Sequence, residues 1–454
     1  MNIKLGSQEK FSVSQFIFVN TWFRMWWRLW YRKVTVHGRK HLYTNKPLIV
    51  TPNHQNAAMD ALVLIGIQTR QIVWLSRADI FKSKFVAAIL RFFKMIPVYR
   101  MQDGVDSLGK NEEIFNKCVQ VLEAHKIVGI FPEATHWGYR RLRALKKAVP
   151  RIAFLAEELS ETSLDIHIVP VGIYYESYVN FRSDLFVNIG EPFSIAEYVA
   201  LYKENKIQAI NALRRRMQDE MKKYMLHINH EGTRYEAYEE LRKICAPYVK
   251  DTYNLRGKKM YTDFQAQKMV IEQLDELLNK DADKLQEIEG AVTEYAEKRS
   301  DMRFREWILA QNGGDEFSII WNSVRLIVGF PLFVLGFIIY GFPFKKTYSL
   351  AQKMADDVQF HNSISFSLGF LIVPILYSIL AGLSVWYFGL NWWMFFVIAA
   401  SLLFVGIVSF DYFILAKKTY HMIRYKYLKY IQNPEIESLI SLRTKIIDMY
   451  SKYV

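Results

Sequence analysis

The chain contains the stretch Leu48-Ile-Val-Thr-Pro-Asn-His-Gln-Asn-Ala-Ala-Met-Asp60, in which a short apolar run leads through a polar turn into a second apolar segment. This pattern predicts a strand followed by a helix. A histidine at such a turn lies at the carboxyl edge of a parallel sheet, where α/β proteins place their sites. Histidine ordinarily titrates near neutral pH, so His54 can take a proton from a hydroxyl while Asp60 orients it. Taken alone, the pair is weak evidence, because an ordinary loop histidine with a satisfied hydrogen bond is the commoner case.

Short β-branched or apolar runs recur on both sides of this turn, separated by longer mixed segments. They cover residues 34–36, 48–51, 72–75, 128–131, 166–172 and 185–189. Strands that alternate with helical segments predict an α/β domain over residues 34–198, with a mostly parallel sheet and flanking helices. Residues 199–317 are polar and lack strand-like runs, so we expect a helical region there.

Three further sequence blocks follow the first one, Asn53-His54 to Asp60, in order along the predicted domain. They are Met95-Ile-Pro-Val-Tyr-Arg100, then Gly129-Ile-Phe-Pro-Glu-Ala-Thr135, then Val169-Pro-Val-Gly172. In this order and spacing the four blocks resemble the glycerolipid acyltransferase superfamily, which includes glycerol-3-phosphate and lysophosphatidate acyltransferases. The resemblance covers residues 34–200.

The resemblance implies a role for each matching residue. His54 is the general base and Asp60 orients it; the substrate-binding positions are Arg100, Glu133, Thr135, Lys146 and Lys147. A guanidinium matches two phosphate oxygens in a fork and stays charged, so Arg100 suits the phosphate of an acceptor. The lysine pair could add to the phosphate pocket or be surface charge.

The chain departs from the family pattern at three places. Five residues separate His54 from Asp60, one more than usual, so the turn must bulge or the helix must start later. Some eukaryotic glycerol-3-phosphate and dihydroxyacetone-phosphate acyltransferases resemble it in this respect. Ala134 stands where glycine is usual, and His136 stands where arginine is common. These changes bear on the acceptor more than on the reaction type.

The implied reaction is direct acyl transfer from a thioester, either acyl-CoA or acyl-carrier-protein, with no cofactor. The sequence shows no serine elbow, P-loop or dinucleotide fingerprint. Cys118 and Cys245 are far apart and have no metal-ligand spacing around them, so we expect no metal site and no disulfide. Lysophosphatidate is the first candidate acceptor. The alternatives are glycerol 3-phosphate, dihydroxyacetone phosphate, an amino lipid without phosphate, or an inactive lipid-binding protein that has lost the reaction.

A net charge of +14 is concentrated near the start, where residues 1–50 hold nine Lys and Arg residues against one Glu. Within residues 16–33, tryptophans 22, 26 and 30 and arginines 24, 28 and 32 each repeat every fourth position. The two stripes predict an amphipathic helix over residues 1–33 that lies in the membrane interface. The alternative is an aromatic helix packed on the domain. Nucleic acid is not an expected partner.

The long uncharged apolar stretches within residues 318–416 predict a membrane domain. Residues 362–410 form a 49-residue stretch without charge, long enough for two crossings that turn near Gly389. Lysines flank the pair on both sides, so the positive-inside rule places the catalytic domain and the basic tail 417–454 in the cytoplasm. Residues 326–344 are also uncharged. We expect a shallow re-entrant hairpin there, with a plain third crossing as the alternative.

Overall fold

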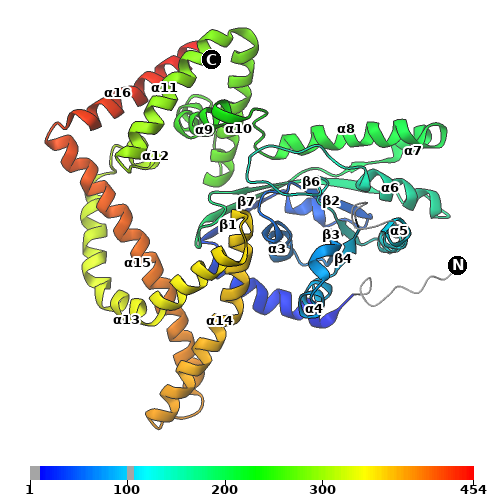
Figure 1. The fold of residues 1–454 in the computed structure, drawn as a ribbon, viewed down its shortest axis with the longest axis horizontal. Helices are drawn as coiled ribbons and strands as arrows, with labels where there is room; N and C mark the ends of the chain where they lie inside the picture. The colour runs from blue at the N-terminus through cyan, green and yellow to red at the C-terminus, as the bar shows by residue number, and fades with distance from the viewer. Residues whose placement is uncertain (1–10, 100–106) are drawn as a thin grey trace. The chain divides into compact units, whose positions relative to one another are not determined.

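The computed structural model describes residues 11–99 and 107–454, which fold into two compact units (Figure 1). The first unit extends to His227 and also includes the distant segment Asp357–Ser363. The second unit comprises Ile228–Asp356 and Ile364–Val454.

The first unit is a mixed sheet with flanking helices. Its strands are β1 (Lys33–His37), β2 (Leu48–Pro52), β3 (Ile72–Arg77), β4 (Met95–Val98), β5 (Ile127–Gly129), β6 (His167–Tyr175), β7 (Asp184–Ile189) and β8 (Phe193–Ser194). Its helices are α1 (Val13–Phe18), η1 (Val19–Phe23), α2 (Arg24–Trp30), η2 (Arg39–Leu42), α3 (Ala58–Ile67), η3 (Ala78–Phe81), α4 (Lys84–Phe92), α5 (Ser107–Glu123), α6 (Ala148–Leu159), α7 (Ala196–Glu204) and α8 (Lys206–Tyr224).

The sheet has the strand order β1-β7-β6-β2-β5-β3-β4, with β8 paired to β6. All neighbouring strands along this order run parallel except β6 and β7. The predicted α/β fold with a mostly parallel sheet is therefore confirmed. Strand β2 lies between β5 and β6 and is buried along its whole length. Its carboxyl end leads directly into the turn that carries His54.

The first unit reaches beyond the predicted boundary at residue 198. Helix α8 buries Leu213, Met217 and Met221 in the same apolar core as the sheet and α6. Gly172 on β6 makes the close approach possible, because a Cβ there would lie 1.8 Å from the carbonyl oxygen of Tyr224. Residues 199–224 are helical, as predicted, but α7 and α8 belong to the first unit and complete the core of its sheet.

The amino-terminal helices differ from the predicted lipid-facing tryptophan stripe. Trp26 and Trp30 are buried in the first unit, and Trp30 packs its ring edge to face on Phe181 at 5.0 Å between centroids. Burial removes more apolar surface from water for these large rings than an interfacial position would. Ile17 and Trp22, on α1 and η1, remain exposed.

The second unit is entirely helical in the part that the structure describes. Its helices are α9 (Gly232–Thr252), α10 (Lys259–Lys280), α11 (Ala282–Asp301), α12 (Glu306–Ala310), α13 (Glu316–Met354), α14 (Val358–Tyr387), α15 (Met394–Tyr430) and α16 (Pro434–Tyr453), and α14 begins in the first unit. Among the described residues, α13, α14 and α15 are the helices long and apolar enough to cross a membrane.

Helix α13 corrects the prediction of a hairpin with a turn within residues 326–344, because it is continuous over 39 residues. It contains Pro331 and Pro343 and is bent along its length in Figure 1, as prolines within a helix cause. Side chains of α15 bind backbone groups on both sides of the first proline: the hydroxyls of Tyr412 and Ser409 donate to the carbonyls of Leu326 and Leu332 at 3.0 and 3.2 Å. The helix is bent but remains continuous.

The tail of the second unit packs on the helices that precede the apolar region. Arg443 of α16 forms an ion pair with Glu306 of α12 at 2.8 Å, and both side chains are largely buried. Arg424 at the end of α15 donates to the carbonyl oxygen of Met302 at 2.7 Å. Residues 417–454 are thus an integral part of this unit.

Candidate active site

The turn after β2 is fixed to the neighbouring strand by Asn53. Its side chain is 1% exposed, accepts a hydrogen bond from the N–H of Ile173 at 2.6 Å and donates to the carbonyl of the same residue at 3.2 Å. A side-chain amide can continue a strand ladder in this way because it carries both a donor and an acceptor. The backbone of His54 is therefore held against β6.

His54 and Asp60 form the predicted pair. The Nδ1 atom of His54 lies 2.9 Å from Oδ2 of Asp60, and the side chains are 15% and 0% exposed respectively. Because a carboxylate accepts, Nδ1 carries the proton, which leaves Nε2 of the neutral ring as an acceptor. The geometry suits a general base oriented by a carboxylate.

Asp60 is held by three further donors. The backbone N–H groups of Gln55 and Asn56 donate to Oδ2, both at 2.8 Å, and the hydroxyl of Tyr175 donates to Oδ1 at 2.7 Å. Burial and the nearby carboxylate raise the pKa of Tyr175 well above its usual value, so its hydroxyl stays protonated and donates. Buried polar groups satisfied to this degree fix one conformation.

Glu133 links the histidine turn to the loop of the third block. One carboxyl oxygen accepts the backbone N–H of His54 at 2.8 Å and the other accepts that of Arg143 at 2.8 Å. The residue is 1% exposed, and its burial raises the pKa of its carboxyl to about 8 against the opposing effect of these two bonds. Its role in acceptor binding remains a prediction, and its contacts show how it holds the base in place.

Aromatic rings support the histidine. The ring of His54 stacks on Phe131 at 4.3 Å between centroids, and Phe131 stacks on Trp74 at 5.4 Å. Gly129 of the third block leaves room for the indole, because a Cβ there would lie 2.5 Å from it. His136 meets His54 edge to face at 5.4 Å.

The other predicted substrate-binding residues differ in their surroundings. Thr135 is half-buried in the loop of Glu133, whereas Lys146 and Lys147 are exposed at the start of α6. Arg100 lies outside the described residues. No group of three or more potential metal ligands occurs among the residues that the structure places.

The departures from the family pattern have a backbone explanation. Helix α3 starts at Ala58, and Ala57 before it has φ 44°, so the extra residue produces both a bulged turn and a late helix start. Ala134 has φ 63°, a left-handed conformation that glycine adopts without strain. Glycine at that position in the family would meet the same backbone requirement.

Sequence reasoning missed Tyr175 and the segment Asp357–Ser363. Tyr175 ends β6 shortly after the fourth block, so its strand position was a usable signal. Asp357, whose Oδ2 lies 3.0 Å from Nε2 of His136, is 221 residues away in sequence and offered no local pattern.

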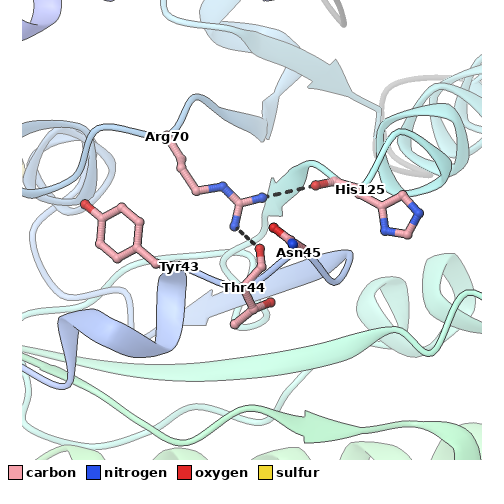
Figure 2. A pocket seen from close by; sticks show the side chains of 5 residues that line it. All are labelled: Tyr43, Thr44, Asn45, Arg70 and His125. Carbon is pink, nitrogen blue, oxygen red and sulfur yellow. Dashed lines mark hydrogen bonds between the residues drawn. The ribbon is translucent and has the colours of Figure 1, made fainter.

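A separate recess lies at the opposite ends of the strands. Figure 2 shows its lining, which is Tyr43, Thr44, Asn45, Arg70 and His125. Residues 70 and 125 precede β3 and β5, whereas His54 follows β2, so the recess and the histidine lie at opposite edges of the parallel sheet. Arg70 donates to three backbone carbonyls, of Leu42, Thr44 and His125, at 2.8 to 3.0 Å. We interpret Arg70 as a structural residue that links the loop before β2 to the loop before β5.

The family model described as "Acyltransferase" matches residues 33–174, which include β1 through most of β6 and all four blocks. Residues 33–174 are therefore similar to an acyltransferase domain. No curated protein sequence matches the chain. Among solved structures it is similar to the 1-acyl-sn-glycerophosphate (LPA) acyltransferase PlsC from Thermotoga maritima, with 18% identity, a TM-score of 0.32, and coverage of 45% of this chain and 78% of that chain.

Proposed function

We propose that the protein transfers a fatty acyl group from an acyl thioester to a hydroxyl of a glycerophospholipid precursor, with lysophosphatidate as the acceptor. The observation that carries the proposal is the His54–Asp60 pair at the carboxyl end of β2, inside the matched acyltransferase domain. An inactive lipid-binding protein would have no need of an oriented base.

The proposed reaction proceeds in two proton transfers around one acyl transfer. Nε2 of His54 takes the proton of the acceptor hydroxyl as its oxygen attacks the thioester carbonyl carbon, and Asp60 stabilises the imidazolium. When the tetrahedral intermediate collapses, the carbon–sulfur bond breaks and the thiol leaves with the proton from His54. Neither a covalent acyl-enzyme nor a cofactor takes part.

The test is His54→Ala in the purified full-length chain, with products identified by mass spectrometry. Oleoyl-CoA and oleoyl-carrier protein serve as donors, and lysophosphatidate, glycerol 3-phosphate and a lysolipid with an amino headgroup serve as acceptors. We expect the variant to lose activity by about 10²- to 10⁴-fold. His125→Ala, at the opposite edge of the sheet, is the matched control and should keep it. Full activity in His54→Ala would refute the proposal.

We further propose that the protein is an integral membrane protein whose helices α14 and α15 cross as a pair. Helices α9–α12 and α16 pack together, so the chain lies on one side of the membrane before α13 and after α15. The segment Asp357–Ser363 belongs to the first unit, which continues into α9 through polar residues. Both ends of α13 then lie on that same side, so α13 does not make a full crossing in this proposal.

Cysteine accessibility tests this topology in sealed cells. Single cysteines replace Ser300, Ser349 and Ser451 in a background lacking Cys118 and Cys245. We expect all three positions to be protected from an impermeant reagent, in keeping with a cytoplasmic catalytic domain. Labelling at 451 but not at 300 would show an odd number of crossings and contradict the paired arrangement.

We also propose a membrane-contacting surface on the first unit, formed by α1, η1 and α4, which includes Trp22 but not the buried Trp26 and Trp30. Phe18 packs on Phe92 at 5.3 Å, which brings these helices together. Their exposed apolar side chains include Ile17, Trp22, Phe85, Val86 and Ile89. Apolar exposure on this scale marks an interaction surface. Phe85→Ser with Ile89→Ser should lower activity on vesicle-bound acceptor but not on detergent-dispersed acceptor, and an equal loss on both would contradict the assignment.

A further inference from the structure

The segment Asp357–Ser363 lies against the candidate active site although it follows α13 in sequence. Oδ2 of Asp357 is 3.0 Å from Nε2 of His136, and His136 is only 11% exposed. Asp357 also accepts the backbone N–H of Gln359 at 3.0 Å, which orients its carboxylate. A second histidine–carboxylate pair therefore lies beside the first.

Aromatic contacts connect the two pairs. Phe360 meets the ring of His136 edge to face at 4.8 Å, and His136 meets the ring of His54 at 5.4 Å. A hydroxyl bound to Nε2 of His54 would thus belong to an acceptor whose neighbouring groups face His136. Burial lowers the pKa of His136 against the opposing effect of the bond to Asp357, which favours the neutral form of the ring. A neutral ring that donates Nε2–H to Asp357 keeps Nδ1 as an acceptor.

The carboxyl end of the segment is anchored in the first unit by two buried contacts. Oδ1 of Asn362 accepts the indole N–H of Trp30 at 3.2 Å, and Oγ of Ser363 accepts the backbone N–H of Met59 at 3.2 Å. Met59 immediately precedes Asp60. The anchor thus reaches the turn that orients the catalytic base.

One polar atom in the segment, Oε1 of Gln359, is buried without a hydrogen-bond partner among the described residues. An unpaired buried polar group is costly, so we expect water or a ligand to complete it. Gln359 lies next to the loop of the third block, since a Cβ on Gly138 would be 2.8 Å from its Nε2.

We propose that Asp357–Ser363 is a wall of the acyl-transfer site, in which Asp357 positions His136 to hydrogen-bond the acceptor beside His54. This inference rests on the proposed function. Asp357 is a positioning residue that acts through His136, and His136 is the residue that contacts the acceptor. The start of the apolar helix α14 thereby supplies part of the specificity of the first unit.

A double-mutant cycle on the full-length chain tests the pair, with oleoyl-CoA and oleoyl lysophosphatidate as substrates. His136→Gln and Asp357→Asn should each raise KM for the acceptor about tenfold, the equivalent of one hydrogen bond, with little change in kcat. The double variant should be no worse than either single variant, because one interaction is lost in each case. Asp357→Glu, which keeps the carboxylate, should recover part of the loss.

Asp356→Asn is the matched control, since Asp356 is the exposed neighbouring residue of the same type. It should leave KM unchanged. Additive effects of the two substitutions, or an unchanged KM in both, would overturn the inference. If Asp357→Asn lowers the folded fraction, the KM of His136→Gln alone tests the inference, because that substitution changes no residue of Asp357–Ser363. His54→Ala separates the two proposals. If that variant loses activity while His136→Gln and Asp357→Asn keep a normal KM for the acceptor, this inference is refuted and the proposed function is not.

Discussion

The two histidine–carboxylate pairs of the site are built in opposite ways. His54 and Asp60 are six residues apart, and Asp60 is fully buried with three further donors around it. His136 and Asp357 are 221 residues apart, and Asp357 is 47% exposed. Breaking a buried pair costs roughly 3–5 kcal/mol, whereas exposed pairs contribute about 0–1 kcal/mol. The first pair is thus suited to fixed geometry, and the second to a contact that substrates can complete.

The largest effect is expected from Asp60→Asn, which removes the charge of the first pair but keeps its shape. Without the carboxylate the imidazolium is not stabilised, so kcat should fall by about 10²- to 10⁴-fold. Asp165→Asn is the control, because Asp165 also neighbours a histidine, His167, but lies 45% exposed at the far end of β6. An equal kcat for Asp60→Asn and the parent chain would show that the buried His54–Asp60 pair is no more important for catalysis than the exposed one.

Tyr175→Phe sharpens the comparison by removing one donor from Asp60. The buried carboxylate loses the 2.7 Å bond at Oδ1, which we expect to lower kcat about tenfold by loosening the orientation of His54. Tyr174→Phe, at the adjacent position of β6, keeps its ring 4.7 Å from the guanidinium of Arg140 and serves as control. If kcat is unchanged in Tyr175→Phe, the backbone donors alone hold Asp60.

Glu133→Gln tests the support of the first pair through pH. Burial raises the folded-state pKa of Glu133 to about 8, above its ordinary value of 4.5. Between these values the folded state binds more protons than the unfolded state, so the contribution of this group to stability falls as pH rises through that window. The glutamine variant cannot titrate. We therefore expect the difference in Tm, variant minus parent, to increase from pH 5 to pH 8. A difference in Tm that stays constant over this range would show that Glu133 is not protonated there.

The sequence could predict the first pair but not the second, for a physical reason. The strand, the turn and the base lie within thirteen residues, 48–60, and local hydrophobic pattern determines such an element. The sheet also followed from alternating runs, although β4 was recognised only as a motif. Burial of Trp26 and Trp30, the extent of α8 and the docking of Asp357 depend on tertiary packing between distant residues. No periodicity in one sequence encodes such pairings.

The smallest effect is expected at Ala134, which lies between Glu133, a support of the first pair, and His136 of the second. Its N–H donates to the carbonyl of Phe131 at 3.1 Å in a tight turn, and its φ of 63° sends the side chains before and after it toward different partners. An alanine pays about 1–2 kcal/mol in this conformation, more than the roughly 0.5–1 kcal/mol of extra chain entropy that glycine loses on folding. Ala134→Gly should therefore stabilise the protein by about 1 kcal/mol or less.

The control for this prediction is Ala200→Gly, the same substitution at an exposed position of α7. There the backbone is ordinary helix, so glycine should destabilise by about 0.5–1 kcal/mol. Opposite shifts of Tm in the two variants would establish that the third block carries strain where its two functional side chains diverge. A loss of stability in both would mean that the turn holds alanine without strain, and that the placement of Glu133 and His136 depends on their hydrogen bonds alone.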